Sequence, residues 1–308
     1  MSHKFVITGG AGFIGSNLAQ ALSQENPEDS QISIVDDLSY GKAENLAGIN
    51  AQLLRGSITD LPFLRTAFEG ADCVFHQAAI ASVKKSIEDP LRTNEVGIAG
   101  TLKVLTAARD AGVRRVVLAS SAAVYGSSLD LPKQEDMIPE PMSPYAVSKL
   151  AGEHYARVFQ EIYGLETVVL RYFNVFGPKQ DPSSEYSGVV SRFITAILKG
   201  EVPVIYGDGE QTRDFVHVAD VVAANILASR GFRPGVYNIA NAKSTSLNDL
   251  VEMISKILGR DVSPRYEVPR STDIRHSLAD ISRARSAGYS PNCSIEEGLK
   301  TTIRWYCR

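Results

Sequence analysis

The chain has few of the residues that build disulfide frameworks and metal sites. Its 308 residues include three cysteines, Cys73, Cys293 and Cys307, which are odd in number and widely separated. They have neither disulfide-framework nor zinc-ligand spacing, and Cys73 lies in an apolar strand pattern where a buried thiol is expected. The five histidines never form a pair at metal-ligand spacing, so we predict no metal site.

Long apolar runs and an excess of one charge are missing as well. No run of about 18 apolar residues occurs, so the sequence offers no candidate membrane span. A strand pattern starts within four residues of the first methionine and leaves no room for a secretory leader, so we expect a cytoplasmic protein. The net charge is −3 without a Lys/Arg stripe, so we expect no nucleic-acid partner.

The first clear pattern is a strand followed by a glycine turn and a helix. Phe5-Val6-Ile7-Thr8 reads as a buried strand that leads into Gly9-Gly10-Ala11-Gly12-Phe13-Ile14-Gly15 and an apolar-periodic helix to about Gln24. Glycine lets the backbone approach a pyrophosphate, and the start of the helix presents free N–H groups to the anion. The pattern therefore predicts a dinucleotide site.

An acidic pair follows the next expected strand, residues 32–35. A carboxylate at Asp36 stands where the adenosine ribose hydroxyls are bound in such sites, and it disfavours a 2′-phosphate. We therefore predict NAD rather than NADP as the cofactor. The alternative for Asp36 and Asp37 is a solvated turn, which the glycines upstream make less favoured.

Strands and helices alternate up to about residue 173. Such alternation predicts an α/β fold with a doubly wound parallel sheet of the Rossmann type, and the continuous apolar runs at 116–119 and 168–170 fit strands covered on both faces. Ligands bind at the carboxyl ends of such strands. The glycine turn, His76-Gln77-Ala78-Ala79 and Ser120-Ser121 all fall at such ends.

Beyond Asn174 the pattern becomes irregular, with loop signals around an expected helix at about 189–199. An apolar helix to about residue 229 and a strand at 235–240 then suggest a return to the first lobe. We therefore predict an NAD-binding domain of residues 1–173 and about 215–240, interleaved with a smaller α/β substrate-binding domain of about 174–214 and 241–308.

Two neighbouring segments carry groups for proton transfer. Ser120-Ser121 supplies hydroxyls, and Tyr145 and Lys149 are spaced to share one face of a helix. A nearby ammonium favours the phenolate of a tyrosine, whose pKa is ordinarily about 10, and a tyrosinate is a general base. A chance surface pair is the alternative for Tyr145 and Lys149 taken alone.

Taken together, these motifs resemble the extended short-chain dehydrogenase/reductase family, and specifically its NAD-dependent nucleotide-sugar epimerases, over essentially the whole length. The resemblance also rests on Arg171-Tyr172-Phe173-Asn174 and on the run from Val204 to Phe215. It implies that Tyr145 takes the proton from the sugar 4-hydroxyl, that Ser121 bonds the same oxygen and that Lys149 binds the nicotinamide ribose. The expected reaction inverts C4 of a UDP-hexose through a 4-keto sugar.

The resemblance also implies two binding sets. The cofactor-binding positions are Gly9, Gly12, Phe13, Ile14, Gly15, Asp36, Asp37, Ile58, Gln77, Ala78, Ala79, Asn94, Ser120, Tyr145, Lys149 and Tyr172. The substrate-binding positions are Ser121, Tyr145, Asn174, Val189, Val204, Tyr206, Arg213, Arg270, Asp273 and Ser277. Arg213 and Arg270 are the positions that bind the diphosphate, for which a guanidinium fork is suited.

Rival reactions within the family are 4,6-dehydration and sugar-acid decarboxylation, which need further acid/base groups beside the catalytic serine or threonine. Here the following residues are Ala122 and Ala123, which cannot move protons, so epimerisation is favoured. A non-catalytic NAD-binding sensor is a further alternative, and the intact Ser121, Tyr145 and Lys149 argue against it.

Three positions bear on substrate and cofactor. Ser277 aligns with a family position that is small in enzymes accepting a 2-acetamido group, which points to UDP-GlcNAc and UDP-GalNAc beside UDP-glucose and UDP-galactose. Ser57 replaces an Asp that usually binds the adenine in the family, and Gly97 replaces an Asn that usually faces the cofactor. We expect both replacements to weaken the retention of NAD. From relatives we expect a homodimer in which residues 90–110 and 145–163 pair with their mates as a four-helix bundle.

Overall fold

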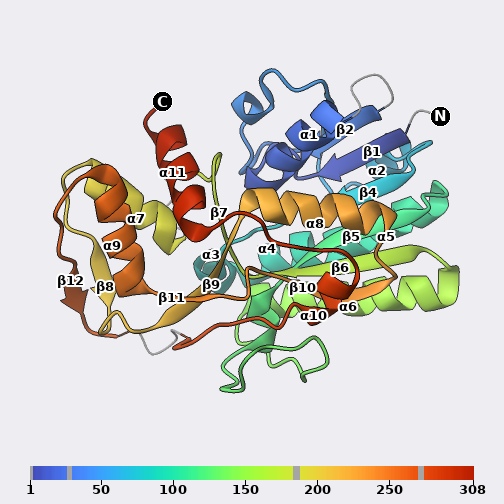
Figure 1. Cartoon of the computed structure of the whole chain (residues 1–308). Coiled ribbons are helices and arrows are strands. Elements are labelled where there is room, and N and C mark those ends of the chain that lie inside the picture. The colour runs from blue at the N-terminus through green and yellow to red at the C-terminus, as the bar shows by residue number, and fades with distance from the viewer. Residues whose placement is uncertain (1–2, 26–29, 183–187, 270–273) are drawn as a thin grey trace.

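The computed structural model describes residues 3–25, 30–182, 188–269 and 274–308. Its centre is a seven-stranded sheet in which every strand pair is parallel (Figure 1). In spatial order the strands are β10 (Gly235–Ile239), β6 (Glu166–Tyr172), β5 (Arg115–Ser121), β4 (Cys73–His76), β1 (His3–Thr8), β2 (Ser30–Asp36) and β3 (Gln52–Arg55). The predicted doubly wound parallel sheet is confirmed.

Helices cover both faces of this sheet. α1 (Phe13–Glu25) and α8 (Val218–Arg230) pack side by side on one face, and α2 (Leu61–Ala67), α5 (Thr101–Asp110) and α6 (Pro144–Tyr163) lie on the other. Because side chains alternate along a strand, β1 divides between two cores, with Ile7 packed on the α1 side and Val6 on the α2 side. Both side chains are fully buried.

The expected long helix over residues 90–110 is divided into three consecutive helical segments. They are α4 (Pro90–Asn94), the π-helical turn η2 (Glu95–Gly100) and α5. Within η2, a Cβ added to Gly97 would stand 2.7 Å from Ser148 Oγ of α6. The glycine thus allows close approach between the π turn and α6. Two short elements flank this region in the sequence. They are the helix α3 (Val83–Glu88), which precedes α4, and the 3₁₀ turn η3 (Ala122–Tyr125), which follows β5.

A second group of elements lies at the left of Figure 1. A three-stranded sheet has the order β11 (Ser244–Ser246), β9 (Thr212–His217) and β7 (Asn174–Phe176), and β8 (Val204–Tyr206) pairs with β12 (Arg265–Glu267). The helices here are α7 (Val189–Leu198), α9 (Leu247–Leu258) and α11 (Ile295–Tyr306), which share a separate apolar core. The short α10 (Ser282–Ser286) instead packs against β10.

The chain passes from β9 of this second group to α8 and β10, where β10 pairs with β6 at the edge of the large sheet, and it returns to the second group at β11. The predicted division into two interleaved domains sets its boundaries near these crossings, at about residues 214 and 240, and it remains a prediction.

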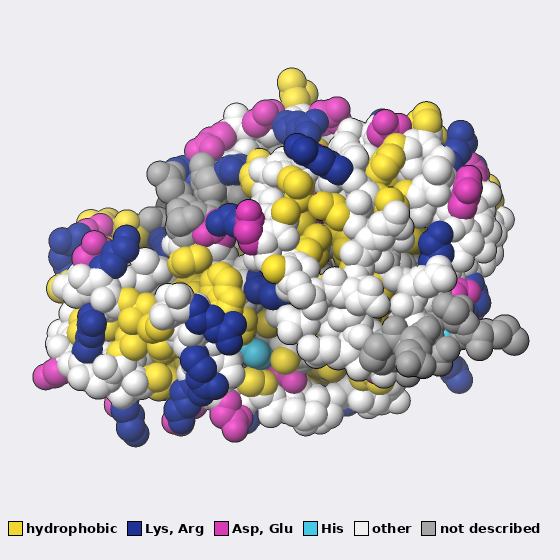
Figure 2. Space-filling model, turned by 90° about the horizontal axis from the view of Figure 1, so that it is seen from above, with side chains coloured by type: hydrophobic (Ala, Val, Ile, Leu, Met, Phe, Trp, Pro, Cys, Tyr) yellow, Lys and Arg dark blue, Asp and Glu magenta, His cyan; other side chains and the backbone are white. Residues whose placement is uncertain are grey.

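Among the described residues, no helix is both long and apolar enough to cross a membrane. Basic, acidic and apolar side chains are interspersed on the face shown in Figure 2.

Candidate functional site

The glycine turn after β1 is held tightly against the loop after β4. Gly9 has φ +69° and donates its N–H to the Val35 carbonyl at 2.8 Å. A Cβ at Gly9 would stand 2.6 Å from both N and Cα of Ala78, and one at Gly15 would collide with the Gly9 carbonyl. Only glycine fits at these two positions, whereas at Gly12 the nearest atom is 3.2 Å away.

Asp36 is bound into this turn and is not a solvated residue. Its Oδ2 accepts from Ala11 N at 2.9 Å, its Oδ1 accepts from Leu38 N at 2.8 Å, and only 7% of the residue is exposed. Burial raises the pKa of Asp36, and the two backbone bonds oppose that rise. Asp37 differs, because it closes a local exposed turn by accepting from Ser39 N.

The loop after β4 rests on a buried histidine. The Thr101 hydroxyl donates to the Gly97 carbonyl at 2.7 Å, so it accepts from His76 Nε2 at 3.0 Å, while His76 Nδ1 accepts from the Thr8 hydroxyl at 2.7 Å. Burial lowers the pKa of His76 to about 3, so the ring is neutral. The network fixes the start of the segment that carries Gln77, Ala78 and Ala79.

Gln77 and Tyr172 are brought together with a residue that sequence reasoning missed, Asn225 of α8. Gln77 Nε2 donates to Asn225 Oδ1 at 2.9 Å, and Asn225 Nδ2 donates to the Tyr172 hydroxyl at 2.8 Å. Asn225 is completely buried. The three side chains therefore support one another across β4, β6 and α8.

Ser121, Tyr145 and Lys149 gather at the carboxyl end of β5. The Ser121 hydroxyl caps η3 by accepting from Ala123 N at 3.1 Å, and its effect on the Tyr145 phenol is to lower the pKa of that group. Lys149 Nζ donates to the Ala119 carbonyl at 2.8 Å and stands 5.9 Å from the centre of the Tyr145 ring. Ser143 caps the start of α6 and thereby places Tyr145 in its first turn.

The expectation that Lys149 lowers the pKa of Tyr145 is wrong for this structure. Burial raises the pKa of Tyr145, and only the bond from Ser121 opposes the rise. Burial also lowers the pKa of Lys149 to about 8, against an opposing effect of Glu153. Desolvation is the largest effect on both groups, and neither residue is a cause of the other's shift.

Ser120 and Ser121 point to different surroundings because they are consecutive residues of a strand. The Ser120 hydroxyl donates to Glu153 Oε1 at 2.5 Å inside the protein. Glu153, on the same face of α6 as Lys149, also receives two bonds from Arg171, at 2.9 and 2.7 Å. Both side chains of this ion pair are about 5% exposed, so the Ser120 side chain serves a buried network.

Two further predicted cofactor positions, Ile58 and Asn94, lie beside η2. Ile58 is buried and packs against Gly100, where an added Cβ would stand 2.8 Å from Ile58 Cδ1. Asn94 is exposed at the last residue of α4. The Ser57 hydroxyl bonds the Thr59 hydroxyl at 2.9 Å within its own turn.

The predicted substrate positions of the second group lie around β9. Arg213 Nη1 donates to the Thr212 carbonyl at 2.8 Å, and Ser277 N donates to the same carbonyl at 3.1 Å. Asn174 Nδ2 donates to the Asp214 carbonyl at 3.2 Å. The structure thus brings Asn174, Arg213 and Ser277 together.

The remaining substrate positions are more dispersed. Val189 and Val204 are the first residues of α7 and β8 and are partly buried. The Tyr206 carbonyl accepts from Gln211 Nε2 at 2.7 Å. Arg270 and Asp273 lie outside the described residues.

Asp214 holds the substrate segments in place and was also missed by sequence reasoning. Its Oδ1 accepts from Asn241 N at 2.9 Å and its Oδ2 from Ala279 N at 3.1 Å, in the segments after β10 and after Ser277. The side chain has no exposed surface. Burial raises the pKa of Asp214 to about 6, against the lowering effect of these bonds.

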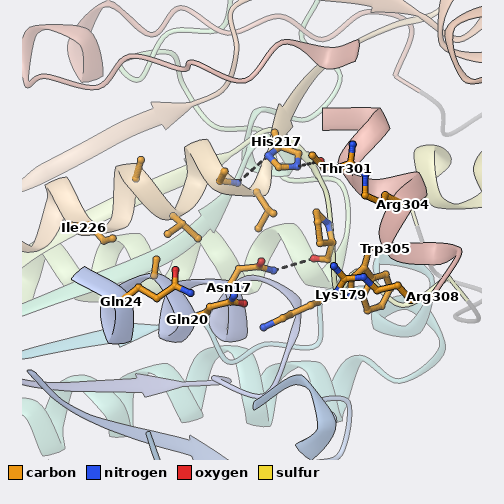
Figure 3. A pocket seen from close by; sticks show the side chains of 16 residues that line it. Asn17, Gln20, Gln24, Lys179, His217, Ile226, Thr301, Arg304, Trp305 and Arg308 are labelled. Atoms are coloured by element: carbon orange, nitrogen blue, oxygen red, sulfur yellow. Dashed lines mark hydrogen bonds between the residues drawn. The ribbon is translucent and has the colours of Figure 1, made fainter. Parts of the chain in front are cut away.

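A groove of about 620 Å³ lies elsewhere, between α1, α8 and α11 (Figure 3). Its lining includes Asn17, His217, Trp305 and Lys179. No predicted site residue lines it. Among the described residues, no group of three His, Cys, Asp or Glu side chains is arranged to hold a metal ion.

Comparison with known proteins gives consistent matches. The model of the NAD dependent epimerase/dehydratase family matches residues 5–240. A UDP-glucose 4-epimerase from Mycolicibacterium smegmatis is 38% identical over 312 residues, covering 98% of each chain. A dTDP-glucose 4,6-dehydratase and a UDP-N-acetyl-alpha-D-glucosaminuronate decarboxylase are also among the relatives.

Two solved structures are similar over the whole chain. A UDP-N-acetylglucosamine 4-epimerase from Methanobrevibacter ruminantium in complex with UDP-N-acetylmuramic acid has a TM-score of 0.95 and 43% identity, covering 100% of this chain and 99% of that one. A UDP-glucose 4-epimerase from Thermotoga maritima with UDP-glucose has a TM-score of 0.94 and 39% identity, covering 99% and 98%.

Proposed function

The chain belongs to the NAD-dependent epimerase/dehydratase family, and from this membership we propose that it is a UDP-hexose 4-epimerase. It inverts C4 through a transient 4-keto sugar. The substrates are UDP-glucose and UDP-galactose, together with UDP-GlcNAc and UDP-GalNAc. The observation that carries the proposal is the gathering of Ser121, Tyr145 and Lys149 at the carboxyl end of β5, with alanine at the two positions that follow Ser121.

The cofactor is NAD, and the residues present fit it. Gly9 and Gly15 have no room for a side chain. A dinucleotide site needs glycine in this turn because the pyrophosphate must come close to the backbone. Each carboxylate oxygen of Asp36 uses one backbone bond and keeps a lone pair for a ribose hydroxyl. When held by these residues, NAD would supply a hydride acceptor and donor for the sugar carbon, so the reaction would have no net redox change.

Tyr145 is the group that moves the proton. In this mechanism its phenolate takes the proton of the sugar 4-hydroxyl, and the same phenol returns it after the keto sugar has turned over. Ser121 bonds the reacting oxygen and, through its contact with Tyr145, favours the phenolate. Lys149, fixed by the Ala119 carbonyl, supplies positive charge on the same side of the helix.

The residues beside Ser121 favour epimerisation over its rivals. Ala122 and Ala123 form the start of η3, where they supply no proton donor or acceptor. A keto sugar held at Ser121 has no second acid/base pair from these positions to drive elimination or loss of carbon dioxide. Return of the hydride is then the remaining route.

Substrate choice follows from the segments around β9. Arg213 is proposed to bind the diphosphate, together with Arg270, and Ser277 to face the sugar C2 substituent. The Arg213 guanidinium and Ser277 N both donate to the Thr212 carbonyl, which supports a shared subsite. The small side chain of Ser277 leaves room for a 2-acetamido group on the sugar. A sugar that carries a 2-hydroxyl in its place should lose only a modest part of the binding free energy.

The test is epimerisation by the purified protein, with and without added NAD, on UDP-glucose and UDP-GlcNAc separately. Proton NMR should show the 4-epimer of both sugars. Activity on UDP-glucose alone would contradict the assignment of Ser277 and keep the mechanism. Formation of a 4-keto-6-deoxy sugar, or no turnover of either sugar with NAD present, would favour the dehydratase or the sensor alternative.

Two variants sharpen the test. Tyr145→Phe should lose at least about a hundredfold in kcat while NAD still binds, since the general base is gone. Tyr155→Phe is the matched control, because Tyr155 lies on the same helix and packs in the core away from Ser121. Ser277→Tyr should remove activity on UDP-GlcNAc and keep that on UDP-glucose.

We also propose that the protein is a homodimer through α3, α4 and α6. Leu91 is 82% exposed, Ile87 61% and Ile162 68%, an amount of exposed apolar side chain that favours an interface on these elements. Light scattering after gel filtration should give twice the mass of 33.4 kDa. Leu91→Glu should shift the protein toward the monomer.

A further inference from the structure

The segment after β7, residues 177–182, runs along the first turns of α1, and we call it the strap. Asn17 of α1 donates to the Pro178 carbonyl at 3.0 Å, a bond visible in Figure 3. A Cβ at Gly177 would stand 2.5 Å from Val218 Cγ1, so the strap also fits closely against the start of α8. The strap therefore has a defined place beside the helix that begins at the glycine turn.

Lys179 occupies the middle of the strap in a conformation that is unfavourable for it. Its φ is +68°, a left-handed backbone that lysine rarely adopts. In this conformation its ammonium reaches two backbone carbonyls, Asn45 O at 3.0 Å and Ser16 O at 3.4 Å. Burial lowers the pKa of Lys179, and among the described residues no carboxylate pairs with it.

The two carbonyls belong to two separate segments of the proposed cofactor site. Ser16 lies in α1, directly behind the glycine turn. Asn45 lies in the 3₁₀ turn η1 (Ala43–Leu46), which is part of the loop after Asp36, and its own side chain donates to the Ala11 carbonyl at 2.9 Å. Ala11 N in turn donates to Asp36. Lys179 thus links the loop that follows the ribose-binding carboxylate to the helix of the pyrophosphate turn.

We propose that Lys179 is a positioning residue that clamps the loop at Asn45 against α1 and so slows the release of NAD. The inference rests on the proposed cofactor site and goes beyond the proposed reaction. It gives a physical reason for a residue with positive φ that touches neither of the predicted binding sets. It also offers a source of cofactor retention where Ser57 and Gly97 replace residues that usually hold the cofactor.

The experiment compares NAD release from the purified holoprotein and its variants. Exchange of bound NAD against isotopically labelled NAD, followed by mass spectrometry and without any sugar, gives the release rate. Lys179→Met keeps the length of the side chain and removes its donors, so release should be about tenfold faster or more. Lys179→Arg keeps the donors and should restore slow release.

Lys42→Met is the matched control, because Lys42 makes another charged link to the strap, to Asp181 at 2.8 Å, from an exposed side chain. Its release rate should equal that of the parent protein. Lys179→Gly relaxes the positive φ and should fold readily, so it must show the same fast release as Lys179→Met.

Unchanged release from Lys179→Met and Lys179→Gly would overturn the proposal. Equal acceleration by Lys42→Met would also overturn it, because the effect would then belong to the strap in general. The kcat of Lys179→Met at saturating NAD should stay within about twofold of the parent value, and a large loss would indicate a general structural role. If the holoprotein fails to epimerise any sugar, the proposed reaction fails, but the release rates still test the clamp.

Discussion

Gly9 and Gly70 form a matched pair that tests the packing of the cofactor turn. Both have nearly the same left-handed backbone, with φ +69° and +68°. A Cβ at Gly70 meets nothing within 4 Å, whereas one at Gly9 stands 2.6 Å from backbone atoms of Ala78. Gly70→Ala should therefore cost only the left-handed strain, about 1 kcal/mol in the free energy of unfolding.

Gly9→Ala adds a collision with backbone to the same strain. Real Cβ contacts are essentially never under 3.0 Å, so the turn and the loop at Ala78 must move apart. Overpacking of this kind brings the expected total to about 3 kcal/mol. Since both moving loops carry proposed NAD contacts, Gly9→Ala should also weaken NAD binding by about tenfold or more, and Gly70→Ala should leave it unchanged.

The measurements are urea unfolding without added NAD and calorimetric titration with NAD. The difference between the two variants isolates the contact with Ala78, because the backbone strain is common to both. Equal losses of stability, or unchanged NAD affinity in Gly9→Ala, would refute the argument that this close contact shapes the cofactor site.

Three other predictions concern buried charges. Glu153→Gln leaves the buried guanidinium of Arg171 without its carboxylate and should cost about 3 kcal/mol or more in urea unfolding, and Arg171→Met in the same chain should recover part of the loss; additive losses would contradict this. Glu153 raises the pKa of Lys149, which is about 8, so Glu153→Gln should move the basic limb of the pH profile of kcat to lower pH. An unmoved limb would contradict the effect of Glu153 on Lys149. Burial raises the pKa of Asp214 in the folded protein from 3.8 to about 6, so its contribution to stability is largest at low pH and is lost as pH rises to about 6. The stability difference between the parent protein and Asp214→Asn should accordingly grow from pH 7 to pH 4.5.

Local patterns in the sequence were sufficient to predict much of the fold and part of the site. The glycine turn, Asp36 at the end of its strand, and Tyr145 and Lys149 on one helix face all depend on residues close together in the chain. Period and spacing report such features directly. The parallel order of the large sheet followed from the alternation of strands and helices.

Contacts between distant segments were not accessible in this way. Glu153 meets Ser120 and Arg171 only once α6 lies on β5 and β6, and Asn225 meets Gln77 across 148 residues of sequence. The raised pKa of Tyr145 has the same origin, because burial depends on the packed structure and not on the spacing from Lys149. One signal was present in the sequence and was not used. Because consecutive residues of a strand point to opposite faces, the side chains of Ser120 and Ser121 could have been assigned to different surroundings.

The edge position of β10 has a consequence for synthesis of the chain on the ribosome. The strand β6 ends at Tyr172, but its outer partner is not made until Gly235–Ile239, after β7, α7, β8, β9 and α8. During that interval the nascent sheet presents an unpaired apolar edge, of the kind that aggregates with other chains. The large sheet is therefore expected to depend on synthesis of the chain as far as β10 for its solubility, and nascent chains that end before β10 should need chaperones.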